Sequence, residues 1–106
     1  MAKYFLIESR SPFDSAEVKN NYQLASDLAS KGHEVTLFLV ENGVFAVRST
    51  AEINDFSKLT NVNLFADDFS LRERGISPNE LKSTIKVADI SIVVKAMAQG
   101  TKTMWL

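Results

Sequence analysis

Apolar residues along the chain alternate between short unbroken runs and stripes at helical spacing. The runs at residues 3–8, 34–40 and 62–66 are rich in branched and aromatic side chains, which is typical of strands buried on both faces of a sheet. Between the first two runs, one stripe has the spacing of an amphipathic helix: Val18, Tyr22, Ala25, Leu28 and Ala29. We expect this helix to be capped by Ser15 and to end at Gly32.

The second half of the chain continues the same alternation. Residues 69–75 are typical of one helical turn closed by glycine, and residues 77–80 (Ser-Pro-Asn-Glu) carry a helix-start signal. A brief fourth strand is predicted at residues 85–88, followed by a helix that Asp89 caps and that ends at Gly100. Residues 101–106 are predicted to form the final strand.

This order of elements predicts one α/β domain over residues 1–106. Strands that alternate with helices form a three-layer sandwich around a mostly parallel sheet, here of about five strands. The chain has 106 residues, 45% of them apolar, which supports one hydrophobic core and is too short for two. Ligands bind such sheets beyond the carboxyl ends of the strands, so residues 9–14, 41–44 and 67–75 are the loops of interest.

Composition narrows the classes of partner and chemistry. Twelve basic and thirteen acidic residues give a net charge of −1, without the positive field that attracts nucleic acid or an anionic membrane. No apolar run approaches the ~20 residues that span a bilayer, and the first residues show no secretory signal. We therefore expect a soluble, cytoplasmic protein with no nucleic-acid or membrane partner.

The chain contains no cysteine and one histidine. Disulfides, thiolate metal sites and cysteine nucleophiles are therefore excluded, and His33 is more typical of a loop residue than of a catalyst. The dinucleotide-binding glycine motif and the P-loop are also missing. A phosphoryl-accepting receiver domain would need an acidic pair after the first strand, where this chain has only Glu8, so that class is disfavoured. We predict no catalytic residue, no metal site and no cofactor.

Polar residues at the predicted strand ends form a candidate pocket. Its members are Asp67, Asp68, Arg74, Gly75, Glu8, Arg10, Asn42 and Gly43. We expect one of the two adjacent aspartates to cap the following turn and the other to be solvated, with Arg72 and Arg74 paired to Asp68 or Glu73. Asp67 is expected to be exposed or half-exposed, so that its replacement by alanine costs no more than ~1–2 kcal/mol of stability.

The segment at residues 62–76 resembles the DsrE/DsrF/DsrH family of sulfur-relay proteins. Its third strand leads through a short turn into Arg74-Gly75-Ile76, as in that family. Two further segments, Arg10-Ser11-Pro12-Phe13 and Met104-Trp105, are similar to DsrH-type members, and Glu41-Asn42-Gly43-Val44 resembles the Asp-Gly-Val of the family. The resemblance covers essentially the whole chain and implies a DsrE/F-like fold.

The resemblance also bears on mechanism, because catalytic members carry a persulfide-accepting cysteine seven residues before the arginine. That position here is Asp67, and a carboxylate cannot form a persulfide. The resemblance therefore implies a non-catalytic member that forms oligomers or docks cysteine-bearing sulfur-relay relatives. The alternative is an α/β protein whose strand-end pocket binds a small anion or nucleotide, with or without a magnesium ion. The magnesium ligands in that case would be Glu8, Asp67 and Asp68.

Apolar residues outside the periodic stripes predict self-association. Residues 44–47 (Val-Phe-Ala-Val) follow a turn directly, and Phe13 and Phe69 lie beside charged residues in loops. On one face they would form an exposed apolar patch of several hundred Å², more than monomers usually tolerate. We expect a homo-oligomer, either a trimer or a hexamer built as a dimer of trimers.

Overall fold

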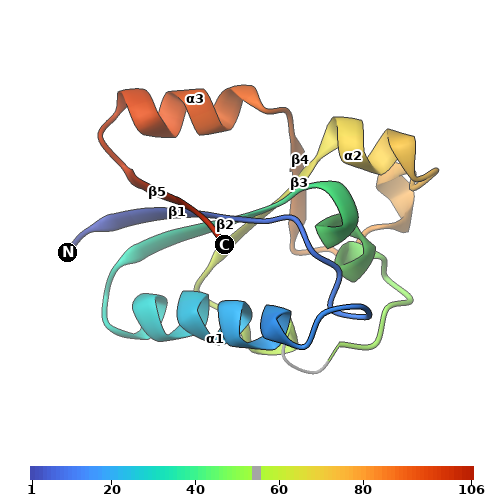
Figure 1. Cartoon of the computed structure of the whole chain (residues 1–106), viewed down its shortest axis with the longest axis horizontal. Helices are drawn as coiled ribbons and strands as arrows, with labels where there is room; N and C mark the ends of the chain where they lie inside the picture. Colours follow the sequence, from blue (N-terminus) through green and yellow to red (C-terminus); the bar gives the residue numbers. More distant parts are fainter. Residues whose placement is uncertain (54–55) are drawn as a thin grey trace.

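A parallel sheet forms the centre of the structure, a computed structural model that describes residues 1–53 and 56–106 (Figure 1). Within these residues the strands are β1 (Lys3–Glu8), β2 (Glu34–Leu39), β3 (Asn63–Asp67), β4 (Ile85–Ala88) and β5 (Lys102–Trp105). They lie in the order β4-β3-β2-β1-β5, and every adjacent pair is parallel. The predicted five-strand α/β domain is confirmed.

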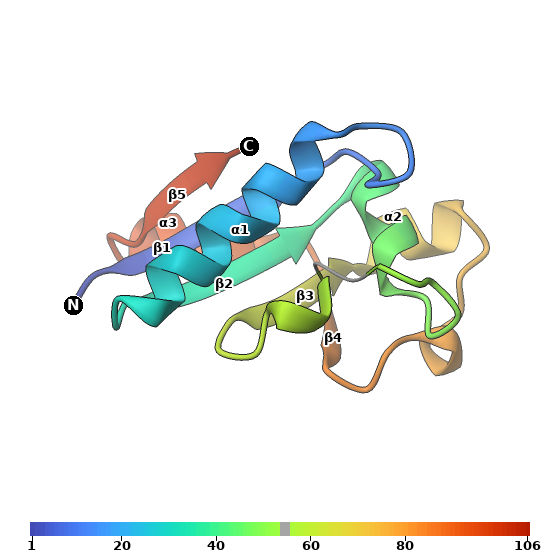
Figure 2. The same cartoon turned by 90° about the horizontal axis from the view of Figure 1, so that it is seen from below.

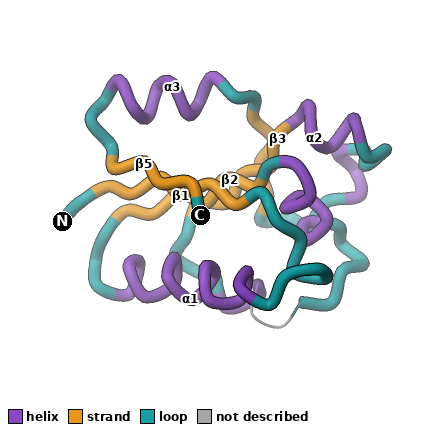
Figure 3. Tube along the Cα trace, in the orientation of Figure 1, coloured by secondary structure: helices purple, strands orange, loops and turns teal. Residues whose placement is uncertain are grey.

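Helices cover both faces of this sheet and make the sandwich three layers thick. Figure 1 shows α1 (Glu17–Ser30) on one face and α3 (Ser91–Ala98) on the other. The short helix α2 (Asp68–Glu73) follows β3 at the carboxyl edge, and Figure 2 shows α1 lying along β1 and β2. The tube in Figure 3 shows the same layering. Because both faces are covered, the central strands need apolar residues at nearly every position.

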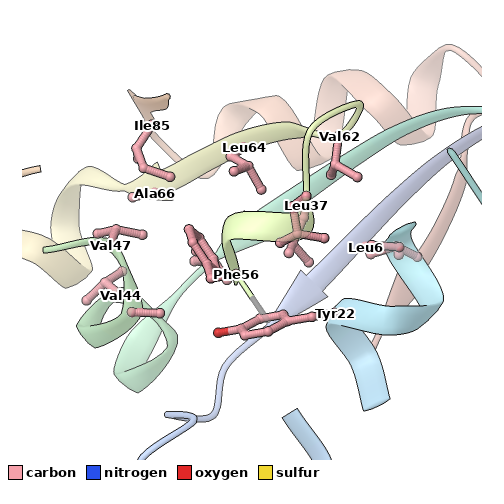
Figure 4. Packing of buried hydrophobic residues seen from close by; sticks show 14 of the residues in the cluster. Leu6, Tyr22, Leu37, Val44, Val47, Phe56, Val62, Leu64, Ala66 and Ile85 are labelled. Carbon is pink, nitrogen blue, oxygen red and sulfur yellow. The ribbon is translucent and has the colours of Figure 1, made fainter. Parts of the chain in front are cut away.

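The larger part of the core lies between the sheet and α1 (Figure 4). Its centre is formed by Leu6, Tyr22, Leu37, Val44 and Phe56, all of them buried. A smaller cluster lies under α3 and contains Phe5, Ile7, Phe38, Val40 and Ala96. The helical stripe predicted for α1 is confirmed, since its first three members are buried and the last two pack against the larger cluster.

The two ends of α1 differ in how well the sequence predicts them. Ser15 was expected to cap the helix, but the N-cap is Ala16, and no side chain caps this end. Ser15 instead accepts a bond from the Val18 N–H through its backbone carbonyl. The predicted end at Gly32 is confirmed, because this residue has a φ of 88°, a left-handed conformation that glycine adopts without steric cost.

Residues 44–47 belong to the 3₁₀ helix η1 (Glu41–Val47), and Val44, Ala46 and Val47 are fully buried. The prediction that this segment joins an exposed patch is therefore wrong. Gly43 explains the burial, because a Cβ atom at this position would lie 2.4 Å from the Glu8 backbone oxygen. The missing side chain lets η1 approach β1 closely and turn its apolar residues into the core.

Two other segments form shorter helices than the sequence suggests. The helix-start signal at residues 77–80 yields only the single 3₁₀ turn η3 (Pro78–Glu80), and the Ser77 hydroxyl donates to side chains instead of capping the backbone. Directly after it, Leu81 pairs with Arg48 in an isolated antiparallel bridge, which ends the helix. Between η1 and β3, η2 (Phe56–Lys58) buries Phe56. Among the described residues, no helix is long and apolar enough to cross a membrane.

A lysine fastens the connection that follows η1 to the segment before β4. The ammonium nitrogen of Lys82 donates to the backbone oxygens of Ala46, Arg48 and Ala51. It also lies 5.8 Å from the centre of the Phe56 ring. Desolvation by burial lowers the pKa of Lys82 below its ordinary value. One side chain thus bonds three carbonyl oxygens, of which Arg48 O also accepts the Ala51 N–H.

We therefore predict that Lys82→Met lowers the free energy of unfolding by about 2–3 kcal/mol, because three carbonyls lose a charged donor. Urea denaturation followed by circular dichroism measures this value. The matched control is Lys86→Met, since Lys86 is exposed and has no bonded partner in the described part of the chain; it should change stability by about 0.5 kcal/mol or less. Equal effects of the two substitutions would contradict a stabilising role of the hydrogen bonds from Lys82.

Candidate functional site

A cleft of about 780 Å³ opens at the carboxyl edge of the sheet. Four parts of the chain line it: the start of η1, helix α2, the turn between β4 and α3, and Trp105 at the end of β5. This is the edge at which open parallel sheets bind ligands. Four of the eight candidate residues predicted from the sequence contribute to its lining: Asn42, Asp67, Asp68 and Arg74.

Asp67 ends β3 and is the N-cap of α2. One carboxylate oxygen accepts hydrogen bonds from the Ser70 backbone N–H at 3.0 Å and from the Ser70 hydroxyl at 2.6 Å. The Ser70 hydroxyl in turn accepts a bond from the Glu41 N–H at 2.7 Å. Asp67 is only 7% exposed, so the expectation of an exposed side chain is wrong. The expected capping role is confirmed, and Ser70 together with η1 covers the carboxylate.

Asp68 points away from this buried network. Its carboxylate lies 3.3 Å from the Arg72 guanidinium, one helical turn further along α2. The Arg72 side chain is exposed and that of Asp68 is half-exposed, so the pair is solvated, as the sequence predicts. The two adjacent aspartates therefore do not converge on one point, which disfavours a shared cation. Within residues 1–53 and 56–106, no group of three or more acidic or histidine side chains is arranged to hold a metal ion.

Each nitrogen of the Arg74 guanidinium donates a hydrogen bond to a residue in the wall of the cleft. Its Nε and Nη2 atoms donate to the Asn42 side-chain oxygen at 3.1 and 2.9 Å, and Nη1 donates to the Ser70 carbonyl oxygen at 3.2 Å. The group also lies 5.8 Å from the centre of the Phe45 ring. The predicted pairing of Arg74 with Asp68 or Glu73 is wrong, because Asn42 on η1 is brought nearer by the fold.

Glu8 and Arg10 lie apart from the cleft, contrary to their prediction as pocket members. Glu8 is fully buried, and its carboxylate accepts bonds from the Asn21 side chain at 2.6 Å and from the Arg10 N–H at 3.1 Å. Arg10 pairs with Glu17 at 2.8 Å, a hydrogen bond that raises the pKa of the Arg10 guanidinium. These residues tie the loop after β1 to helix α1.

Two glycines of the candidate set have backbone roles and do not line the cleft. Gly43 is required by the close approach of η1 to Glu8 described above. Gly75 adopts a φ of 66° directly after Arg74, where the chain leaves α2. Both positions support the walls of the cleft without contributing a functional group to it.

Several residues of the cleft were not among the sequence candidates. They are Val40, Glu41, Phe45, Phe69, Ser70, Arg72, Glu73, Asp89, Ile90 and Trp105. Trp105 could have been found, because it ends a predicted parallel strand and must lie at the same edge as Asp67. Asp89 was identified only as a helix cap; hydrogen bonds from Ser91 lower its pKa, so its carboxylate is charged at pH 7.

The hydrogen bonds of Asp67 lead to a prediction about stability that replaces the smaller effect expected from the sequence. Asp67→Ala removes the acceptor of two buried Ser70 donors and should lower the free energy of unfolding by about 2–4 kcal/mol. Asp68→Ala, the adjacent control, breaks only a solvated ion pair and should cost about 0.5 kcal/mol or less. Urea denaturation of both variants measures the difference, and similar losses would refute the buried network.

Comparisons with known proteins agree with this architecture. The family model described as "DsrE/DsrF-like family" matches residues 2–106. The YchN protein of E. coli has a similar structure, with a TM-score of 0.88 and 20% sequence identity over 100% of both chains. MTH1491 of Methanobacterium thermoautotrophicum, described as a protein of unknown function, has a TM-score of 0.75 and 22% identity over 97% of this chain and 96% of its own.

At this level of identity the two structures show a shared fold, and no curated protein matches the chain. The family match extends over nearly all of the chain, including the strand, turn and Arg-Gly sequence on which the sequence-based resemblance rests. The chain therefore belongs to the DsrE/DsrF-like family.

Proposed function

We propose that this chain is a non-catalytic DsrE/DsrF-like subunit of a sulfur relay. In this proposal it assembles into a homo-oligomer, a trimer or a hexamer, and docks cysteine-bearing relatives that carry the sulfur. The proposal includes the cytoplasmic location expected from the sequence. It accounts for two features of the described residues: the hydrogen bonds around Asp67, and the exposed apolar side of α3.

The state of Asp67 carries the proposal. In the catalytic sulfur-relay proteins that the sequence resembles, the matching position carries the persulfide-accepting cysteine. Transfer of a sulfane sulfur requires a thiolate that attacks the donor and keeps the outer sulfur. The 106 residues contain no thiol, and the carboxylate at this position is engaged by Ser70 as a helix cap. A structural acceptor has taken the place of a nucleophile.

The exposed side of α3 supports assembly. Ile90, Val94 and Met97 lie four and three residues apart, on one side of the helix, and are 57%, 65% and 62% exposed. The opposite side of α3 already packs on the sheet through Ala96 and its neighbours. A helix that is apolar on both sides is typical of one buried in a larger assembly. This outer stripe of α3 (Ile90, Val94 and Met97) replaces residues 44–47 as the surface expected to self-associate.

The alternative of an anion or nucleotide site is less well supported. Such a site needs cationic groups whose donors face the ligand. All three nitrogens of the Arg74 guanidinium donate to protein oxygens, and Arg72 pairs with Asp68. Glu8 and Arg10, which the alternative also requires, do not line the cleft.

The first test concerns sulfur chemistry. After incubation with a small-molecule persulfide donor and removal of the excess, the intact mass of the chain should remain unchanged, because no thiolate can accept the sulfur. Mass spectrometry measures this directly. A variant with an exposed thiol, Asp14→Cys, treated in parallel, is the positive control for donor activity. A stable gain of one sulfur atom on the unmodified chain would refute the non-catalytic role.

The second test concerns assembly. Light scattering coupled to size exclusion should give a mass that is three or six times the 11.8 kDa of the chain. Val94→Lys should shift this mass toward the monomer, because a charged side chain in an apolar interface is costly to desolvate. Gln99→Lys makes the same charge change at the C-cap of α3, outside the outer stripe, and should leave the mass unchanged. A wild-type mass near 11.8 kDa would refute self-association.

A further inference from the structure

The walls of the cleft are largely apolar and remain uncovered. Phe69 from α2 and Trp105 from β5 line it and are 61% and 60% exposed. Phe45 and Val40 add to the apolar part of the lining, and Ile90 lies where the cleft borders the outer stripe of α3. Aromatic rings that face a cleft of this size and lack a covering segment are typical of a surface that receives part of another molecule.

The charge of the cleft indicates what kind of molecule that is. Its lining carries five carboxylates and two guanidinium groups, a net charge of −3. The chain as a whole has a net charge of only −1, so negative charge is concentrated at this edge. The cleft therefore favours a positively charged occupant over a phosphate or a carboxylate.

Two of these carboxylates have no partner of their own. Among the described residues, no cationic side chain lies within salt-bridge distance of Glu41 or Glu73, and both side chains are exposed. The other three are engaged by Ser70, Arg72 and Ser91. Glu41 also has a φ of 49°, although it is not a glycine, and its N–H bond to Ser70 holds it there at the mouth of η1.

We propose that the cleft receives an arginine side chain of a partner protein. The guanidinium stacks on the exposed rings of Phe69 and Trp105 and binds the free carboxylates of Glu41 and Glu73. Arginine fits better than lysine, because its planar group stacks on aromatic faces and binds carboxylates through two parallel donors. The inference rests on the partner-docking part of the proposed function and states the chemistry that the docking site recognises.

The only tryptophan of the chain makes the proposal directly measurable. Trp105 lines the cleft, so its fluorescence reports on an occupant without a label. The probe is the peptide acetyl-Leu-Arg-Leu-amide, and the matched control is acetyl-Leu-citrulline-Leu-amide, which has the same shape without the charge. We expect the arginine peptide to change the emission saturably, with an affinity at least about threefold higher than that of the citrulline peptide.

Variants of the chain test the assigned carboxylates. Glu41→Gln and Glu73→Gln should each weaken binding of the arginine peptide by about twofold to fivefold, because each removes one charge that the guanidinium binds. Asp14→Asn is the control, since Asp14 is an exposed acidic residue of the β1–α1 loop that does not line the cleft. It should bind as the wild type does. Circular dichroism confirms that each variant is folded.

The outcomes separate this inference from the proposed function. No fluorescence response to the arginine peptide, equal affinity for the citrulline peptide, or full affinity in both glutamine variants would overturn the arginine site. An unmodified homo-oligomer that fails these titrations would leave the non-catalytic subunit intact and refute only the inference. A chain that takes up sulfur or remains a monomer would refute the proposed function, whatever the titration shows.

Discussion

The hydrogen bonds that join Asp67, Ser70 and the Glu41 N–H hold together the carboxyl edge of the sheet, where the cleft lies. They fasten the end of β3 and the adjoining first turn of α2 to the start of η1, which lies 29 residues from Ser70 in the sequence. Because these groups are buried, loss of one partner leaves the others without a bond and without water. Arg74, Asn42 and the walls of the cleft take their positions from this connection.

This role explains how a position associated with a nucleophile can carry a carboxylate. At the end of a parallel strand and the start of a helix, a side chain lies beside unpaired backbone N–H groups. Those groups lower the cost of a negative charge, whether on a thiolate or on a carboxylate. In this chain the carboxylate uses them for capping, while the cleft beside it keeps exposed aromatic rings and free acidic groups. In the role proposed above, recognition of a partner requires no sulfur chemistry at this position.

Prediction from the sequence succeeded where one local pattern decides the outcome and failed where distant segments meet. Unbroken apolar runs located the strands, and the stripe that contains Val18 and Tyr22 located α1. The burial of Asp67 was missed because Ser70 and η1 cover it, and the separation of Glu8 from the cleft was missed because Asn21 of α1 binds its carboxylate. Residues 44–47 were misassigned because their burial depends on the contact of Gly43 with β1.

The sequence alone therefore determined the fold class, the family resemblance and the absence of thiol chemistry. Hydrophobic periodicity is a local property, and the missing cysteine is a matter of composition. Only the tertiary structure decided which polar residues share the cleft, that Arg74 is engaged by Asn42, and that α3 is apolar on its outer side as well. Such contacts depend on how strands and helices far apart in the chain are brought together, and the order of residues does not specify those distances.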